Sequence, residues 1–187
     1  MFPSPIGTRI QVVGPSCSGK TTLAAELAQR FALEFVELDA LFWEPNWQEP
    51  DREVFARKVK EAIAAPGWVL AGNYTSRAAS IVWPVVETIV WLDFPLRTTL
   101  PRIVLRSRRR WRAKELLWGT NYERFWPQLK VWSPADSLLA YNIRHGREFR
   151  RRLEDASRDP AWAHIRWVRL RSPKAAGRWL ATLPRAR

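Results

Sequence analysis

The chain has 187 residues, which fits one typical domain or one domain with an inserted lid. Its content of 47% hydrophobic and 12% aromatic residues is ample for a core and excludes a disordered chain. Residues 1–94 carry 8 basic and 11 acidic side chains, whereas residues 95–187 carry 23 basic and 7 acidic ones, so the net charge of +13 arises in the second half.

Alternating strand and helix patterns run along the first half of the chain. Short apolar or alternating runs predict strands at 9–14, 34–38, 67–71 and 88–92. Apolar residues at helical spacing predict a helix over 20–31, and Asp51 is a plausible N-cap for a second helix that ends at Ala65. This alternation favours a parallel sheet with helices on both faces.

The second half continues the pattern around an irregular basic stretch. A helix is expected to begin near Leu96 and to run into an arginine cluster, and Pro101 must then lie within its first two turns. Residues 111–134 are irregular, and further elements are expected as a helix over 135–153, a strand over 165–170 and a helix over 174–183. We therefore expect one domain over 1–187 with a lid or insert at about 106–150.

Cysteine content and hydropathy indicate in which cell compartment the protein is expected. Cys17 is the only cysteine, which excludes an intramolecular disulfide framework and a cysteine-rich zinc site. No apolar run approaches the roughly 20 residues of a membrane span, and residues 1–8 lack the pattern of a signal peptide. We expect a cytoplasmic protein that does not contact a membrane.

The strongest motif is the phosphate loop Gly14–Thr21, which fits G-x-x-x-x-G-K-[ST]. It follows an apolar strand and opens an amphipathic helix, which is the context that the motif requires. Its backbone N–H groups are expected to hold the phosphates of ATP, Lys20 to reach the β- and γ-phosphates, and the Thr21 hydroxyl to ligate Mg²⁺. The predicted nucleotide-binding residues of this loop are Gly14, Pro15, Ser16, Cys17, Ser18, Gly19, Lys20, Thr21 and Thr22.

Further motifs follow the loop in a specific order. They are Glu37-Leu-Asp39 with Trp43 and Trp47, Trp68–Tyr74, Val90–Pro95, the arginines 102, 106 and 110, and Trp132-Ser-Pro134. Together with the loop they resemble the adenylate-kinase-like P-loop proteins that are often called topology modulation proteins. The resemblance implies an α/β P-loop fold like that of nucleoside monophosphate, shikimate and gluconate kinases. That fold has a five-stranded parallel sheet of order 2-3-1-4-5 and a lid after the fourth strand.

The acceptor side of this fold lies after the second and third strands. In related small-molecule kinases an acidic residue at the position of Asp39 contacts the acceptor hydroxyl or the metal, so the resemblance gives Asp39 a ligand-facing role, with a helix cap or turn as the alternative. Trp43 can line the acceptor pocket. Asn73 and Arg77 are acceptor contacts or members of a structural turn. Where adenylate kinases have an acidic residue this chain has Ala71, which leaves Asp39, Asp93 or a water alone near the metal. The pattern favours a structural role for Asp93 over a metal role, as a cap of the helix after Pro95.

Arginines dominate the predicted lid. Arg102, Arg106, Arg109 and Arg110 are spaced to share one helix face, and like charges so close require an anion or solvent around them. Arg102, Arg106 and Arg110 are therefore predicted to stabilise the transferring phosphoryl group. The resemblance implies that Arg102 also stacks on the adenine and that Arg171 lies in an adenine-binding loop.

Three functions fit this sequence. The first is an ATP- and Mg²⁺-dependent kinase that phosphorylates a nucleotide or another small molecule. The second is a nucleic-acid-associated protein, either a polynucleotide kinase or a regulator of DNA topology, because tryptophans are interleaved with the arginines. The third is a nucleotide-binding regulator with low turnover, which Ala71 favours. The sequence leaves monomer and homodimer equally open.

Overall fold

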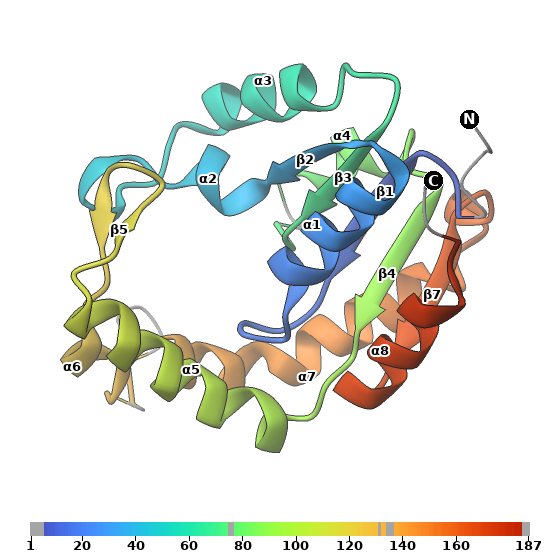
Figure 1. Cartoon of the computed structure of the whole chain (residues 1–187). Coiled ribbons are helices and arrows are strands. Elements are labelled where there is room, and N and C mark those ends of the chain that lie inside the picture. Colours follow the sequence, from blue (N-terminus) through green and yellow to red (C-terminus); the bar gives the residue numbers. More distant parts are fainter. Residues whose placement is uncertain (1–5, 75–76, 131, 134–136, 185–187) are drawn as a thin grey trace.

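The computed structural model describes residues 6–74, 77–130, 132–133 and 137–184. A parallel sheet of five strands forms its centre (Figure 1). The strands are β1 (Arg9–Val13), β2 (Glu34–Glu37), β3 (Trp68–Ala71), β4 (Thr88–Leu92) and β7 (Arg166–Leu170). They lie in the order β2-β3-β1-β4-β7, and this confirms the predicted order 2-3-1-4-5 of the main sheet.

Helices cover both faces of the sheet, as predicted. Because successive strand residues point to opposite faces, β4 directs Ile89 and Trp91 into one core and Val90 and Leu92 into the other. The first core also receives apolar residues of α2 (Leu38–Phe42), α3 (Arg52–Ala62), α4 (Ala79–Val82) and α7 (Leu138–Ala156). The second is covered by α1 (Lys20–Phe31) and α8 (Pro173–Thr182).

The chain between β4 and β7 leaves the sheet as helix α5 (Leu96–Arg112). Pro101 lies in the second turn of this helix, as the sequence requires. The stretch that looked irregular contains an antiparallel hairpin of β5 (Leu116–Leu117) and β6 (Asn121–Tyr122), followed by the short helix α6 (Phe125–Gln128). Pro134 of the predicted motif lies outside the described residues.

The β5–β6 hairpin contacts the 3₁₀ helix η1 (Pro45–Trp47), which lies in the segment that follows α2 (Figure 1). The backbone N–H of Trp47 donates to Oδ1 of Asn121 at 2.8 Å, and its indole N–H donates to the carbonyl of Tyr122 at 3.0 Å. Residues that follow β4 therefore bridge to residues that follow β2. In the part of the chain that the structure describes, no helix is both long and apolar enough to cross a membrane.

Candidate active site

The loop between β1 and α1 has a backbone path suited to an anion. Gly19 has a left-handed conformation (φ 95°) directly before Lys20 opens α1. At Gly14, a Cβ atom would lie 2.7 Å from the carbonyl oxygen of Leu92 on β4, so only glycine fits there. The loop thus curls around the N-terminus of α1, where backbone N–H groups and the helix dipole favour negative charge. Burial raises the pKa of the Cys17 thiol, which keeps this loop residue neutral.

Lys20 is folded back over its own loop. Its Nζ atom donates to the carbonyl oxygens of Gly14 and Pro15 at 3.0 and 3.1 Å. Burial lowers the pKa of Lys20, and Arg106 lowers it further, whereas Asp39 acts in the opposite direction. The lysine can therefore exchange two carbonyl partners for phosphate oxygens without leaving the loop.

Asn73 holds the start of the same loop from the end of β3. Its Oδ1 accepts from the backbone N–H of Gly14 at 2.9 Å, and its Nδ2 donates to the Gly14 carbonyl at 2.8 Å. Both ends of the amide are therefore used by one glycine of the phosphate loop. This geometry assigns Asn73 a positioning role, although the sequence left it between an acceptor contact and a structural turn.

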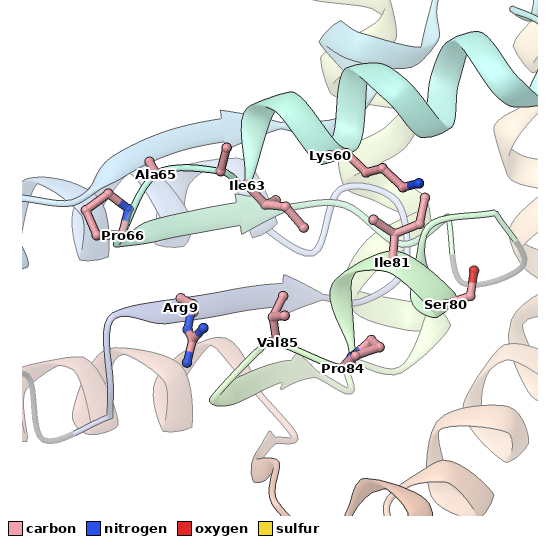
Figure 2. Close-up of a pocket in the computed structure, with 10 residues that line it drawn as sticks. Arg9, Lys60, Ile63, Ala65, Pro66, Ser80, Ile81, Pro84 and Val85 are labelled. Atoms are coloured by element: carbon pink, nitrogen blue, oxygen red, sulfur yellow. The ribbon is translucent and has the colours of Figure 1, made fainter.

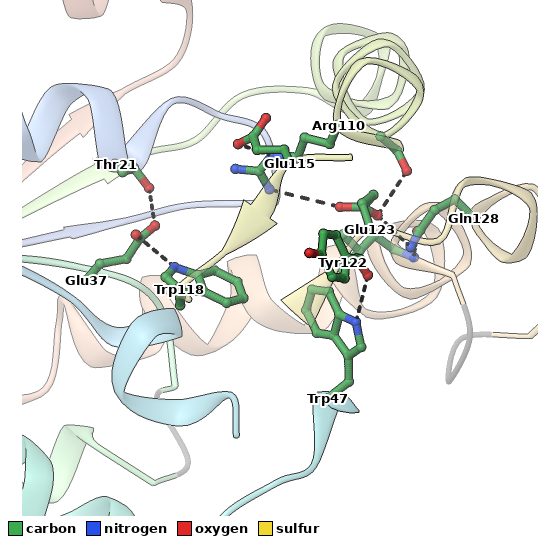
Figure 3. Close-up of polar contacts among 11 residues, drawn as sticks. Thr21, Glu37, Trp47, Arg110, Glu115, Trp118, Tyr122, Glu123 and Gln128 are labelled. Atoms are coloured by element: carbon green, nitrogen blue, oxygen red, sulfur yellow. Dashed lines mark hydrogen bonds and ion pairs between the residues drawn. The ribbon is translucent and has the colours of Figure 1, made fainter. Parts of the chain in front are cut away.

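Thr21 and Glu37 meet next to the loop (Figure 3). The Thr21 hydroxyl donates to Oε1 of Glu37 at 2.8 Å, and the indole N–H of Trp118 donates to the other carboxylate oxygen at 3.1 Å. Glu37 ends β2 and pairs in register with Ala71 of β3. A carboxylate on the neighbouring strand thus lies beside the position where the sequence has alanine.

Asp39 lies in α2, two residues after Glu37. Its Oδ1 accepts from the Tyr74 hydroxyl at 2.7 Å. Burial raises the pKa of Tyr74, and the nearby Asp39 and Glu49 carboxylates raise it further, so the phenol keeps its proton and donates it. Arg77 donates to Oε2 of Glu49 at 2.6 Å, and its guanidinium lies 5.1 Å from the centre of the Phe42 ring.

A single cavity of about 2170 Å³ joins these groups. The phosphate loop lines it through Pro15, Ser16, Cys17, Gly19, Lys20, Thr21 and Thr22, and Asp39, Trp43, Asn73 and Arg77 line it as well. The cavity also receives five arginines of α5: Arg97 and the four that the sequence placed on one helix face, Arg102, Arg106, Arg109 and Arg110. Arg102 and Arg109 are exposed, whereas Arg106 and Arg110 are half-buried.

Arg106 and Arg110 differ in their partners. The Nε atom of Arg106 is buried and has no hydrogen-bond partner among the described residues. Arg110 lies 3.3 Å from Glu115 and 4.0 Å from the buried Glu123. The Nε atom of Arg110 is also buried without a hydrogen-bond partner in the described part of the chain. Of the two, Arg106 is the one with no carboxylate partner among the described residues, so it is more available to an anion. Arg171 follows β7, is exposed, and is not among the residues that line the cavity.

Helix α7, which is far from the phosphate loop in sequence, also contacts the loop. The buried Asn142 accepts a hydrogen bond from the backbone N–H of Ser16 in the phosphate loop at 3.1 Å. Further along, Arg150 of α7 and Arg169 of β7 both donate to Asp93, at 2.7 Å for each of their closest contacts. Asp93 is only 7% exposed, and its two arginines use both carboxylate oxygens. This pairing makes Asp93 a structural anion instead of a metal ligand.

A second hollow of about 620 Å³ lies at the other end of the sheet (Figure 2). Apolar side chains such as Ile63, Ile81 and Val85 line it together with Lys60 and Arg9. Arg9 is bound to Glu87 at 3.0 Å, and no residue of the phosphate loop takes part. The hollow therefore has fewer groups that could bind a ligand or take part in a reaction than the cavity beside Lys20.

Comparisons with known proteins show the fold. Shikimate kinase from Acinetobacter baumannii in complex with shikimate has a TM-score of 0.56 and 19% identity, with 93% of this chain and 89% of that chain covered. A sugar kinase from Janibacter sp. has a TM-score of 0.50 and 21% identity, with 93% of both chains covered. A gluconokinase from Sinorhizobium meliloti has a TM-score of 0.50 and 18% identity, with 93% of this chain and 91% of that chain covered.

The chain has the fold of the P-loop small-molecule kinases. No family model matches the chain, and no curated protein matches it. The resemblance to topology modulation proteins therefore stays a prediction.

Sequence reasoning gave no site role to four side chains that make contacts in the site. Glu37 carried a usable signal, because it is an acidic residue at a strand end two positions before Asp39. Trp118 and Asn142 carried none, since they reach Glu37 and Ser16 over 81 and 126 residues of chain. Tyr74 was quoted within a motif without the hydrogen bond to Asp39 that its place after β3 creates.

Proposed function

We propose that the protein transfers the γ-phosphoryl group of ATP to a hydroxyl group of a small molecule. One observation carries the proposal: a phosphate loop with its lysine faces the same cavity as Asp39, and the two charges lie close enough for Asp39 to act on the pKa of Lys20. A carboxylate beside the reaction centre accepts a hydrogen bond from a hydroxyl and repels an anionic acceptor. A hydroxyl acceptor therefore suits this site better than a phosphate acceptor.

Two side chains, one at the N-terminus of α1 and one at the end of β2, fit a magnesium ion. Thr21 Oγ1 and Glu37 Oε1 are hard oxygen donors that lie 2.8 Å apart on the cavity wall. Among the described residues no group of three or more His, Cys, Asp or Glu side chains forms a metal cage. This suits Mg²⁺, which takes one or two protein ligands and completes its shell with phosphate and water. When bound, Mg²⁺ neutralises phosphate charge.

The chain's own residues divide the work. The phosphate loop holds the triphosphate, and Lys20 stabilises the negative charge on the β- and γ-phosphates. Arg106 can donate a hydrogen bond from its free Nε to the same region. Asp39 orients the acceptor hydroxyl, and Tyr74 fixes the carboxylate by donating to Oδ1. Positioning of this kind supplies most of the catalysis in phosphoryl transfer.

The reaction balances without a further reagent. The bond between the γ-phosphorus and its bridging oxygen breaks, and the acceptor oxygen bonds to that phosphorus. The hydroxyl proton passes to Asp39 or to solvent, and the products are ADP, a phosphate ester and one proton. We place the lid in the segment 106–150, because this stretch brings arginines and the docked hairpin over the cavity.

A coupled ADP-release assay tests the proposal. The acceptor panel contains sugars, amino sugars, sugar acids, shikimate, nucleosides and nucleoside monophosphates. We expect ADP release that depends on one hydroxyl acceptor and falls by at least about 100-fold in Lys20→Ala, since the loop loses its charge at the transferring group. Acceptor-dependent release that is unchanged in Lys20→Ala would show that the phosphate loop is not the active site.

A second candidate function is the phosphorylation or binding of nucleic acid. The observation in its favour is that Trp126 and Trp132 are 65% and 76% exposed and that Arg108, Arg112 and Arg124 are exposed as well. A 5′-hydroxyl oligonucleotide in the same assay tests it. If no phosphate is transferred and the oligonucleotide binds no tighter than heparin, this candidate fails.

A further inference from the structure

The two sides of the cavity carry opposite charges. Between Arg30 and Arg52 the chain has six acidic residues and no basic one, and this segment supplies the side that faces the α5 arginines. We call this side the acceptor wall and define it by the residues Glu37, Asp39, Phe42, Trp43, Trp47, Glu49, Tyr74, Arg77 and Trp118. It contains three carboxylates and one guanidinium, so its net charge is negative.

The only basic residue of the acceptor wall is already neutralised. Arg77 donates to Glu49 at 2.6 Å and lies over the Phe42 ring. An anionic acceptor would have to displace Glu49 from Arg77 and would still face Asp39 and Glu37. The wall therefore disfavours carboxylates and phosphates, which the α5 side attracts.

Two carboxylate oxygens of the wall accept no hydrogen bond from the part of the chain that the structure describes. No described residue donates to Oδ2 of Asp39 or to Oε1 of Glu49, whereas their other oxygens bind Tyr74 and Arg77. Both carboxylates act on the pKa of the same residue, Tyr74, so they lie in one neighbourhood. One free oxygen suffices for the acceptor hydroxyl, which leaves the other for a second donor.

Aromatic rings line the same cavity as these oxygens. The rings of Trp43 and Trp47 are 5.5 Å apart and those of Trp47 and Trp118 are 5.8 Å apart, with edge-to-face geometry in both pairs. Indole faces attract cations through their quadrupole, and a carboxylate beside them adds direct charge attraction. The wall already holds one cation in this way, because Arg77 lies between Glu49 and Phe42.

We propose that the acceptor is a hydroxyl-bearing organic amine, such as an amino sugar or an aminocyclitol. Asp39 binds the hydroxyl that receives the phosphoryl group, and Glu49 with the indoles of Trp43 and Trp47 binds the protonated amine. This inference rests on the proposed kinase function and specifies its acceptor class. The donor and the acceptor then bind on opposite sides of the cavity, each facing charges of the opposite sign.

Binding of matched rings tests the acceptor class. The full chain is first loaded with Mg²⁺ and a non-hydrolysable ATP analogue, and calorimetry then measures glucosamine, glucose and glucuronate, and an aminocyclitol against inositol. We expect each amine to bind about tenfold more tightly than its neutral counterpart and the sugar acid to bind more weakly than both. The amine's advantage should vanish at a pH above the pKa of the amine.

Variants separate the wall from general electrostatics. Glu49→Gln should reduce the advantage of the amine to about twofold or less, because the amine loses its charge partner and also faces Arg77 without its ion-pair partner. Glucose is uncharged, and its binding should stay unchanged. Glu53→Gln, an equal charge change on the exposed face of α3 outside the cavity, is the matched control and should keep the advantage.

The outcomes distinguish this inference from the function on which it rests. Equal binding of amine and neutral ring, or tighter binding of an acid or a nucleoside monophosphate, overturns the amine acceptor while ATP binding keeps the kinase proposal intact. Failure of the chain to bind the ATP analogue overturns the kinase proposal itself.

Discussion

The two hydrogen bonds between Asn73 and Gly14 can be tested by removing the amide. In Asn73→Ala the backbone N–H and carbonyl of Gly14 lose partners at 2.9 and 2.8 Å in a partly buried position. A net contribution of about 0.5–1.5 kcal/mol for each bond predicts that the free energy of unfolding falls by about 1–3 kcal/mol. The Gly14 carbonyl keeps Lys20 as a donor, which places the loss in the lower part of that range.

Nucleotide binding should suffer as well, because the loop that holds the phosphates begins at Gly14. We expect the affinity for ADP to fall about tenfold, which corresponds to about 1.4 kcal/mol. Urea unfolding measures the stability, and calorimetry measures ADP. Asn73→Asp keeps an acceptor for the Gly14 N–H but turns a carboxylate oxygen toward the Gly14 carbonyl, so it should not rescue either quantity.

The control is Gln29→Ala on the exposed face of α1, which should leave both quantities within error. If Asn73→Ala matches this control in stability and in ADP affinity, the amide does not hold the loop. A raised KM for the acceptor with unchanged ADP binding would instead make Asn73 an acceptor contact.

Three further outcomes follow from the same contacts. Glu37→Gln should raise the Mg²⁺ concentration for half-maximal ADP release about tenfold and leave ADP affinity in the absence of metal unchanged; an unaltered Mg²⁺ titration would remove Glu37 from the metal site. Burial lowers the pKa of Lys20, so the folded chain binds fewer protons than the unfolded chain between that pKa and 10.5. The free energy of unfolding, measured relative to that of Lys20→Met, should therefore rise with pH in this range. A difference in urea unfolding that stays constant between pH 8 and 10 contradicts it. Asp93→Asn should lower the free energy of unfolding by about 2–4 kcal/mol, since Arg150 and Arg169 lose a buried anion, and a loss below about 1 kcal/mol in urea would show that solvent replaces it.

Local signals predicted most of the fold. The strands of the main sheet were visible as alternating or continuous apolar runs, and the phosphate loop fixed the junction of β1 and α1. The hairpin β5–β6 was invisible, because each of its strands has two residues and no period can be read from two positions. Its position comes from tertiary contacts with Trp47, which lies more than 70 residues earlier.

Local signals predicted the site unevenly. The loop residues and Asp39 could be predicted because their spacing is set by one strand and one turn, and most of them line the cavity. Asn73 was found as a residue but its partner was not, because hydrogen bonding to Gly14 depends on β3 lying beside β1. The sequence left Asp93 between a structural helix cap, which it favoured, and a place near the metal, and only the packing of α7 and β7 reveals that two arginines occupy it.

The uneven charge of the sequence acquires a physical meaning once the sheet is folded. The acidic first half supplies the phosphate loop and the acceptor wall, but within the cavity its only basic side chains are Lys20 and the paired Arg77 among the described residues. Such a half alone holds a triphosphate poorly, because the four negative charges of ATP exceed what one lysine and a helix dipole offset. The arginines of α5 supply the missing charge, and the hairpin after α5 is bonded to Trp47 and Glu37 across the site. The chain thus keeps most of its anion-binding side chains on the segment between β4 and β7, and the same segment completes the aromatic wall with Trp118.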